Sequence, residues 1–100
     1  MDCSAYVSWV LYEYLGASKF SNIYRSYDFN DQSKWLPGWT KININNIQPG
    51  DILVKNGHVG IYIGNGHTLE AGSTNSIRKE YTYNSVQSVI NAYNFAIRIE

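Results

Sequence analysis

The chain has 100 residues, of which 44% are hydrophobic and 16% are charged, so it is long enough for one domain with a small core. Eight basic residues balance eight acidic ones, giving a formal net charge of zero, which argues against a general nucleic-acid or anionic-membrane binder. No segment approaches the roughly 20 apolar residues of a membrane span, and no secretory signal follows Met1.

The first predicted element is an amphipathic helix that begins at Asp2, a favourable N-cap residue, and ends near Gly16. Its apolar stripe, with spacings of three and four residues, consists of Val7, Val10, Leu11, Tyr14 and Leu15. The single cysteine, Cys3, lies four residues before Val7, so it shares that stripe. In the first turn of a helix the backbone dipoles favour a thiolate. The alternative is that Cys3 is a small buried hydrophobe.

Residues 17–46 show no clean periodicity and are predicted to form a long connecting loop. Trp35 and Trp39 favour an ordered loop that packs back on the domain. The two tryptophans either border a substrate groove or fill the core. No repeat, linker or second domain is visible, so residues 1–100 are interpreted as a single domain.

From Ile47 onward the pattern is that of antiparallel strands. A turn at residues 49–51 precedes a strand at 52–54, and Asn56-Gly57 is a strong hairpin signal. Further strands are predicted at 58–63, from 68 to 71, at 77–83 and at 95–99, with a turn at 64–66. The sequence therefore predicts an α+β domain in which the N-terminal helix packs on an antiparallel meander.

Cys3 and His58 are the candidates for nucleophilic chemistry, because an imidazole can accept a thiol proton and keep the thiolate. Packing of the helix stripe on the sheet is expected to bring the two together. The imidazole normally needs a third group that orients it. Two candidates for that group, His67 and Glu70, follow in the next strand.

The parity of side chains along the strands selects Glu70. If the turn comprises the three residues 64–66, Ile63 pairs with His67, and Glu70 lies opposite Gly60 on the face that carries His58. A two-residue turn would instead place Glu70 on the opposite face. His67 is expected at the turn, exposed and roughly 15–20 Å from His58 along the strand.

Three blocks of this sequence resemble the motifs of the NlpC/P60 cysteine peptidases, in the same order and with similar spacing. They are Asp2-Cys3-Ser4-Ala5 before a helix, the Pro-Gly-Asp turn and strand at residues 48–54, and the histidine strand at residues 58–64. The last strand, at residues 95–99, is also similar. The resemblance covers most of the chain outside residues 17–46, and the three blocks together are specific.

This resemblance implies a papain-like fold and hydrolysis of peptidoglycan stem peptides, usually between γ-D-glutamate and the following diamino acid. Cys3 matches the nucleophile and His58 the general base. Glu70 falls at the third, polar position, where histidine is most common in the family, and a carboxylate can also orient an imidazole. Asp2 and Ser4 match residues that contact substrate, although helix capping is an equally good explanation for them.

Family domains normally carry a further segment before the nucleophile, including a tyrosine near the active site. Because this chain begins two residues before Cys3, we expect it to be truncated at its N-terminus or to be a piece of a longer protein. The backbone N–H of Cys3 is one candidate oxyanion donor. By resemblance, the protein is expected to act outside the cell or in the cell wall.

Two other functions are also consistent with the sequence. One uses the same Cys–His pair, and the other is that of a module derived from the peptidase. The first is a related amidase or acyltransferase, which substrate profiling would distinguish. The second is a non-catalytic wall-binding module, in which the thiol would react slowly. The sequence contains no metal cluster, phosphate loop or cofactor fingerprint, so no cofactor is expected. The expected partner is a peptidoglycan stem peptide.

Overall fold

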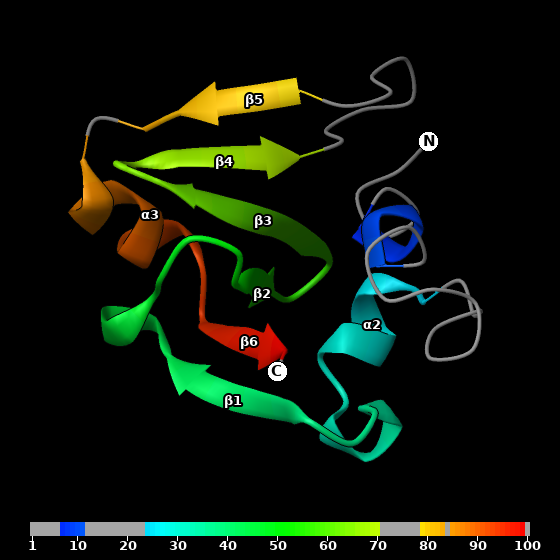
Figure 1. Ribbon diagram of the computed structural model, residues 1–100. Helices are drawn as coiled ribbons and strands as arrows, with labels where there is room; N and C mark the ends of the chain where they lie inside the picture. Colours follow the sequence, from blue (N-terminus) through cyan, green and yellow to red (C-terminus); the bar gives the residue numbers. More distant parts are fainter. Residues whose placement is uncertain (1–6, 12–23, 71–78, 84, 100) are drawn as a thin grey trace.

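The computed structural model describes residues 7–11, 24–70, 79–83 and 85–99 (Figure 1). Residues 7–11 are helical. The other helices are α2 (Ser26–Phe29) and α3 (Val86–Ala92), with 3₁₀ turns η1 (Gln32–Lys34) and η2 (Ile44–Asn46). The strands are β1 (Trp39–Asn43), β2 (Ile52–Lys55), β3 (His58–Gly64), β4 (His67–Glu70), β5 (Lys79–Thr82) and β6 (Phe95–Ile99).

The six strands form one sheet in the order β1-β6-β2-β3-β4-β5, and every neighbouring pair is antiparallel. The predicted α+β class and antiparallel sheet are therefore confirmed. The strands from β2 to β5 form the expected meander. The prediction of a simple meander is wrong at its end, because β6 returns across the sheet and lies between β1 and β2.

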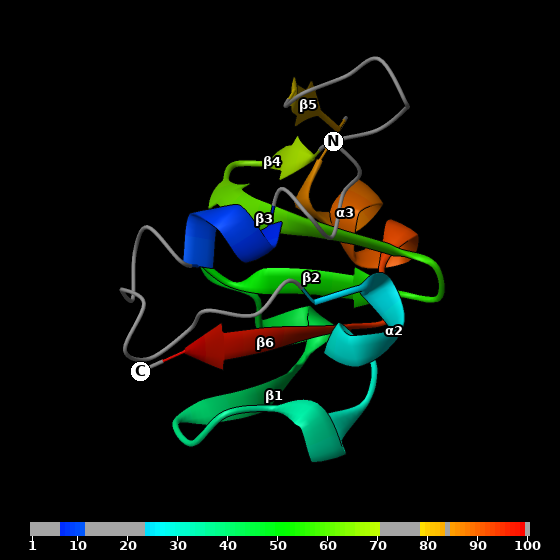
Figure 2. The same ribbon diagram turned by 90° about the vertical axis from the view of Figure 1, so that its right-hand side faces the viewer.

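Alternate residues of the central strands supply two separate cores, one on each face of the sheet. On one face, Ile52 and Val54 of β2 join Val59 of β3 in a cluster with the helical residues Val7 and Leu11. On the other face, Leu53 of the same strand β2 packs with residues of α3 and with Tyr93. Figure 1 shows residues 7–11 and α2 on one side of the molecule and α3 on the opposite side, and Figure 2 views the molecule from the side of residues 7–11 and α2.

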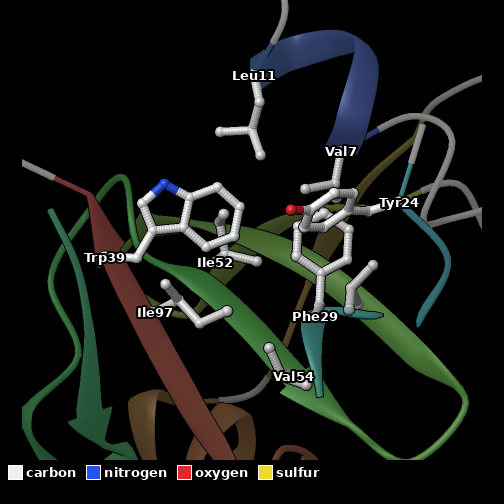
Figure 3. Packing of buried hydrophobic residues seen from close by; sticks show 9 residues of the cluster. Val7, Leu11, Tyr24, Phe29, Trp39, Ile52, Val54 and Ile97 are labelled. Atoms are coloured by element: carbon white, nitrogen blue, oxygen red, sulfur yellow. The ribbon is translucent and has the colours of Figure 1, made fainter. Parts of the chain in front are cut away.

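Aromatic residues from the predicted loop close the core beside residues 7–11. Phe29 of α2 is fully buried and stacks on Trp39 with 6.2 Å between ring centroids. Tyr24 packs edge-on against Phe29, and Ser8 in the N-terminal helix bonds both the backbone N–H and the carbonyl of Tyr24. Figure 3 shows Tyr24, Phe29 and Trp39 beneath Leu11, with Val7 beside the Tyr24 ring.

Two stretches are more regular than the sequence predicted. The predicted loop at 17–46 contains α2, η1, β1 and η2 within its described part. Helix α3 was not predicted at all, although Ser85 is a regular N-cap whose side chain accepts a hydrogen bond from the Ser88 N–H. Both were missed because they are short, and short elements are stabilised mainly by tertiary packing.

Candidate active site

His58 and Glu70 form a hydrogen-bonded pair at the centre of the candidate site. The Asn56-Gly57 turn, with Gly57 at a φ of 81°, starts β3 at His58. Glu70 is the last residue of β4, the next strand of the meander. Its Oε1 lies 2.5 Å from Nε2 of His58, so the predicted pairing of these two residues is confirmed. The Glu70 side chain is 7% exposed and that of His58 is 22% exposed.

The turn that sets this pairing differs from the expected one. Ile61 pairs with Leu69 and Tyr62 with Thr68, as predicted, but Gly64 rather than Ile63 pairs with His67. The loop therefore has two residues, Asn65 and Gly66, both with positive φ. A β-bulge between Tyr62 and Gly64 absorbs the extra residue and restores the predicted parity.

The second oxygen of Glu70 accepts hydrogen bonds from two hydroxyl groups. Thr68, fully buried and two residues earlier on β4, donates to Oε2. Tyr83, which follows β5, donates to the same oxygen at 3.1 Å. Burial raises the pKa of Glu70, but hydrogen bonds from His58 and Thr68 outweigh it and hold that pKa below its ordinary value of 4.5. Glu70 is therefore ionised at neutral pH.

Tyr93 packs against the His58 imidazole in the candidate site. Its ring stacks on the His58 imidazole with 6.0 Å between centroids, and Lys55 Nζ lies 5.7 Å from the same ring. The Tyr93 hydroxyl is buried and makes no hydrogen bond to the described residues. Burial raises the pKa of Tyr93 well above its ordinary value, and the charge of Glu70 raises it further. Tyr93 therefore stays neutral, and its ring packs against one face of the imidazole.

Gly60 is required between these side chains. A Cβ at this position would lie 2.8 Å from the Tyr93 hydroxyl and 2.9 Å from Cγ of Glu70. We expect Gly60→Ala to displace both side chains and to cost about 1–3 kcal/mol of unfolding free energy, measured by urea titration. Gly57→Ala is the comparison, because Gly57 has open space around it but a positive φ. A loss of unfolding free energy from Gly60→Ala no greater than that from Gly57→Ala would contradict a steric role for Gly60.

Of the other predicted site residues, the structure describes the two tryptophans, Trp35 and Trp39. Cys3, Asp2 and Ser4 lie outside the described residues. Trp39 lies in the core beside Phe29, and the indole N–H of Trp35 donates to the Phe29 carbonyl at 2.8 Å. Both tryptophans thus have packing roles, and a contact with substrate stays a prediction.

His58 and the described part of the N-terminal helix use opposite faces of the sheet. His58 has the parity of Gly60 and Tyr62, whereas Val59 faces Val7. However, His58 is the first residue of β3 and Glu70 the last of β4, so the pair lies at one end of the sheet. In Figure 1 residues 7–11 lie on the side where β3 begins and β4 ends.

His67 does not join the pair. It begins β4 beside the turn and pairs with Gly64 and Thr82. It is half-buried rather than exposed as predicted. The ladder places it at the opposite end of β4 from Glu70, which agrees with its rejection as the third group.

A separate apolar cavity of about 280 Å³ lies under the N-terminal helix, lined by Val10, Leu11, Gly50, Ile52, Ile61 and Ile99. Ile52 and Ile61 belong to the face opposite His58, so this cavity is not part of the candidate site. Among the described residues, no group of three or more His, Cys, Asp or Glu side chains is placed to hold a metal ion. None of the described helices has the length and hydrophobicity of a membrane span.

Three residues that contact His58 or Glu70 were not predicted from the sequence. Thr68 has the parity of Glu70 on the same strand, so alternation alone could have indicated it. Tyr83 ends the strand predicted at 77–83, which follows β4 in the expected meander, but the pattern gives no register between the two strands. Tyr93 comes from a segment that the pattern does not place relative to β4. No local signal identifies them.

Comparison with known proteins supports the resemblance noted in the sequence. The family model described as NlpC/P60 family matches residues 1–94 of the chain. No curated protein and no solved structure matches it significantly.

Proposed function

The chain belongs to the NlpC/P60 family, and on that premise we propose that it is a cysteine endopeptidase that cleaves peptidoglycan stem peptides. The family generally comprises cysteine peptidases and acts on peptidoglycan. The proposed bond joins γ-D-glutamate to the following diamino acid, and the proposed fold relationship is papain-like. This substrate would place the site of action outside the cytoplasm, in the cell wall.

The observation that carries the proposal is the His58–Glu70 pair, with 2.5 Å between Nε2 and Oε1. An ionised carboxylate at this distance accepts the Nε2 proton and favours the tautomer in which Nδ1 is the basic nitrogen. In the proposed mechanism Nδ1 therefore exchanges a proton with the thiol of Cys3. Glu70 also stabilises the imidazolium that forms when the thiol is deprotonated.

The reaction proceeds in two steps. The Cys3 thiolate attacks the carbonyl carbon of the scissile amide, the C–N bond breaks, and the imidazolium of His58 gives its proton to the leaving amine. The product of this step is a thioester. Water, deprotonated by His58, then attacks the thioester and releases the carboxylic acid and the Cys3 thiol. The backbone N–H of Cys3 is the proposed donor to the tetrahedral oxyanion.

The first test is digestion of purified peptidoglycan by the parent protein and by Cys3→Ala, with products identified by mass spectrometry. We expect the parent to release fragments cut within the stem peptide and Cys3→Ala to release none, because no other residue can form the thioester. Circular dichroism of both proteins checks that they are folded. No cleavage by a folded parent would contradict the proposal, and products of amide transfer would indicate an acyltransferase instead.

A further inference from the structure

The carboxylate of Glu70 is held at both oxygens, and the two oxygens have different partners. Oε1 contacts only Nε2 of His58 among the contacts described above, whereas Oε2 accepts from the hydroxyls of Thr68 and Tyr83. A carboxylate with one oxygen anchored by two donors cannot rotate freely about its last torsion. Its other oxygen is therefore aimed at the imidazole.

We propose that Thr68 and Tyr83 are positioning residues that orient the Glu70 carboxylate toward His58. This role rests on the proposed function and deepens it, because it explains how a glutamate can serve as the third group of the site. Neither residue touches the reacting atoms in this mechanism. Both act through Glu70.

The two hydroxyls that contact Glu70 come from different parts of the chain. The contacts are therefore not explained by sequence proximity to Glu70 alone. Thr68 shares β4 with Glu70, so its side chain lies on the same face two residues away. Tyr83 follows β5, and its backbone N–H donates a hydrogen bond to the Gly66 carbonyl at 2.8 Å. A side chain anchored near the start of β4 thus extends along the sheet to the residue that ends the same strand.

Other charged or titratable groups around Glu70 are few among the described residues. His58 faces it from β3, Tyr93 from the segment after α3, and Tyr83 from the segment after β5. Lys79 is its backbone partner in β5, and Lys55 pairs with His58 across β2 and β3. Tyr93 stays uncharged at neutral pH because its pKa is raised, and the hydroxyls of Thr68 and Tyr83 are the hydrogen-bond donors to Glu70.

Thr68→Val and Tyr83→Phe remove one hydroxyl each and nearly conserve shape, and the double variant removes both. We measure the Glu70 carboxyl titration by carbon-13 NMR and the dependence of kcat and KM on pH. Each variant is expected to raise the Glu70 midpoint by about one pH unit, since hydrogen bonds to a charged group favour its charged form. We expect kcat to fall about 10-fold in the double variant with KM little changed.

The sign of the pH effect follows from the direction of the shift. Glu70 must be ionised to hold the imidazolium, so activity is lost as pH falls through its pKa. Raising that pKa moves the acidic limb of the kcat profile to higher pH. A purely structural loss of stability would lower activity at every pH and leave the limb in place.

Thr68→Ser keeps the hydroxyl and is expected to restore most of the activity and the midpoint. Tyr27→Phe, on the exposed side of α2, is the control for loss of a tyrosine hydroxyl. The proposal is overturned if the double variant has the parent's midpoint and acidic limb while Glu70→Gln still lowers activity. If Cys3→Ala still cleaves peptidoglycan, the proposed function itself fails, and the positioning role fails with it.

Discussion

Replacing His58 by alanine is expected to lower kcat/KM for stem-peptide cleavage by about 10³–10⁴-fold. The variant loses both the base that deprotonates the thiol and the acid that protonates the leaving amine. The chain has one other histidine, His67 at the start of β4, which provides a matched control. His67→Ala is expected to keep activity within about twofold of the parent, as for a substitution away from the site.

Comparison of His58→Ala with the parent also tests whether Cys3 and His58 interact in the folded protein. Cys3 is the only cysteine, so the rate of alkylation by iodoacetamide reports on this thiol alone. An ion pair with His58 keeps the thiolate below neutral pH, whereas an ordinary thiol has a pKa of about 8.5. At pH 6 we expect His58→Ala to react about 10²-fold more slowly than the parent.

The alkylation profile separates a catalytic pair from a structural cysteine without requiring a substrate. If parent and His58→Ala show the same dependence of alkylation on pH, Cys3 and His58 are not coupled and the proposed mechanism is wrong. Glu70→Gln is expected to give an intermediate result. Its amide oxygen can still accept the Nε2 proton, but it lacks the charge that stabilises imidazolium.

Asp51→Ala is expected to cause the largest loss of stability, about 3 kcal/mol of unfolding free energy. Arg98 donates to both carboxylate oxygens, from Nε at 3.0 Å and from Nη2 at 2.9 Å, and the Gln48 N–H donates to Oδ2 at 2.8 Å. The Asp51 side chain is 3% exposed. Its removal takes the acceptor from the Gln48 N–H and the charged partner from the partly buried Arg98 guanidinium, which keeps its hydrogen bond to the Asn46 carbonyl.

Urea unfolding measures this effect as a shift in midpoint at constant slope. Because a domain of this size is stabilised by roughly 5–15 kcal/mol, the variant remains folded in buffer but unfolds at much lower urea. Asp31→Ala is the control, since Asp31 is exposed and also caps a backbone N–H, that of Ser33. It is expected to shift the urea midpoint much less than Asp51→Ala does.

Arg98→Met, alone and combined with Asp51→Ala, divides the loss between the ion pair and the Gln48 contact. We expect the losses of unfolding free energy from the two substitutions to be less than additive, because each substitution removes the same Asp51–Arg98 ion pair. A loss from Asp51→Ala no greater than that from Asp31→Ala would show that the bidentate contact contributes little. This prediction is independent of catalysis, so it tests the fold alone.

Much of the sheet was predictable because its signals are local. The Asn56-Gly57 turn and the alternation of apolar residues define β2 and β3, and β6 coincides with the predicted strand at residues 95–99. The strand predicted at 77–83 contains β5, Lys79–Thr82, while residues 77 and 78 lie outside the described residues. Helix α3 and strand β1 escaped prediction, since their short segments depend on packing against the sheet.

The candidate site was predictable to the extent that it depends on strand parity. The pairing of Ile61 with Leu69 was expected, and it places Glu70 beside His58. The turn was assigned wrongly, yet the bulge restored the same parity. This outcome was not deducible, because a two-residue turn without a bulge would have placed Glu70 on the other face.

The sequence by itself determined the family, the α+β class and the hairpin of β2 and β3, because motif order, periodicity and turn chemistry act between near neighbours in the chain. Only the tertiary structure decided that β6 lies inside the sheet and that residues 7–11 pack on the face opposite His58. It also brought Tyr83 to Glu70 and Tyr93 to His58. These arrangements depend on contacts between residues far apart in the chain, which no local pattern encodes.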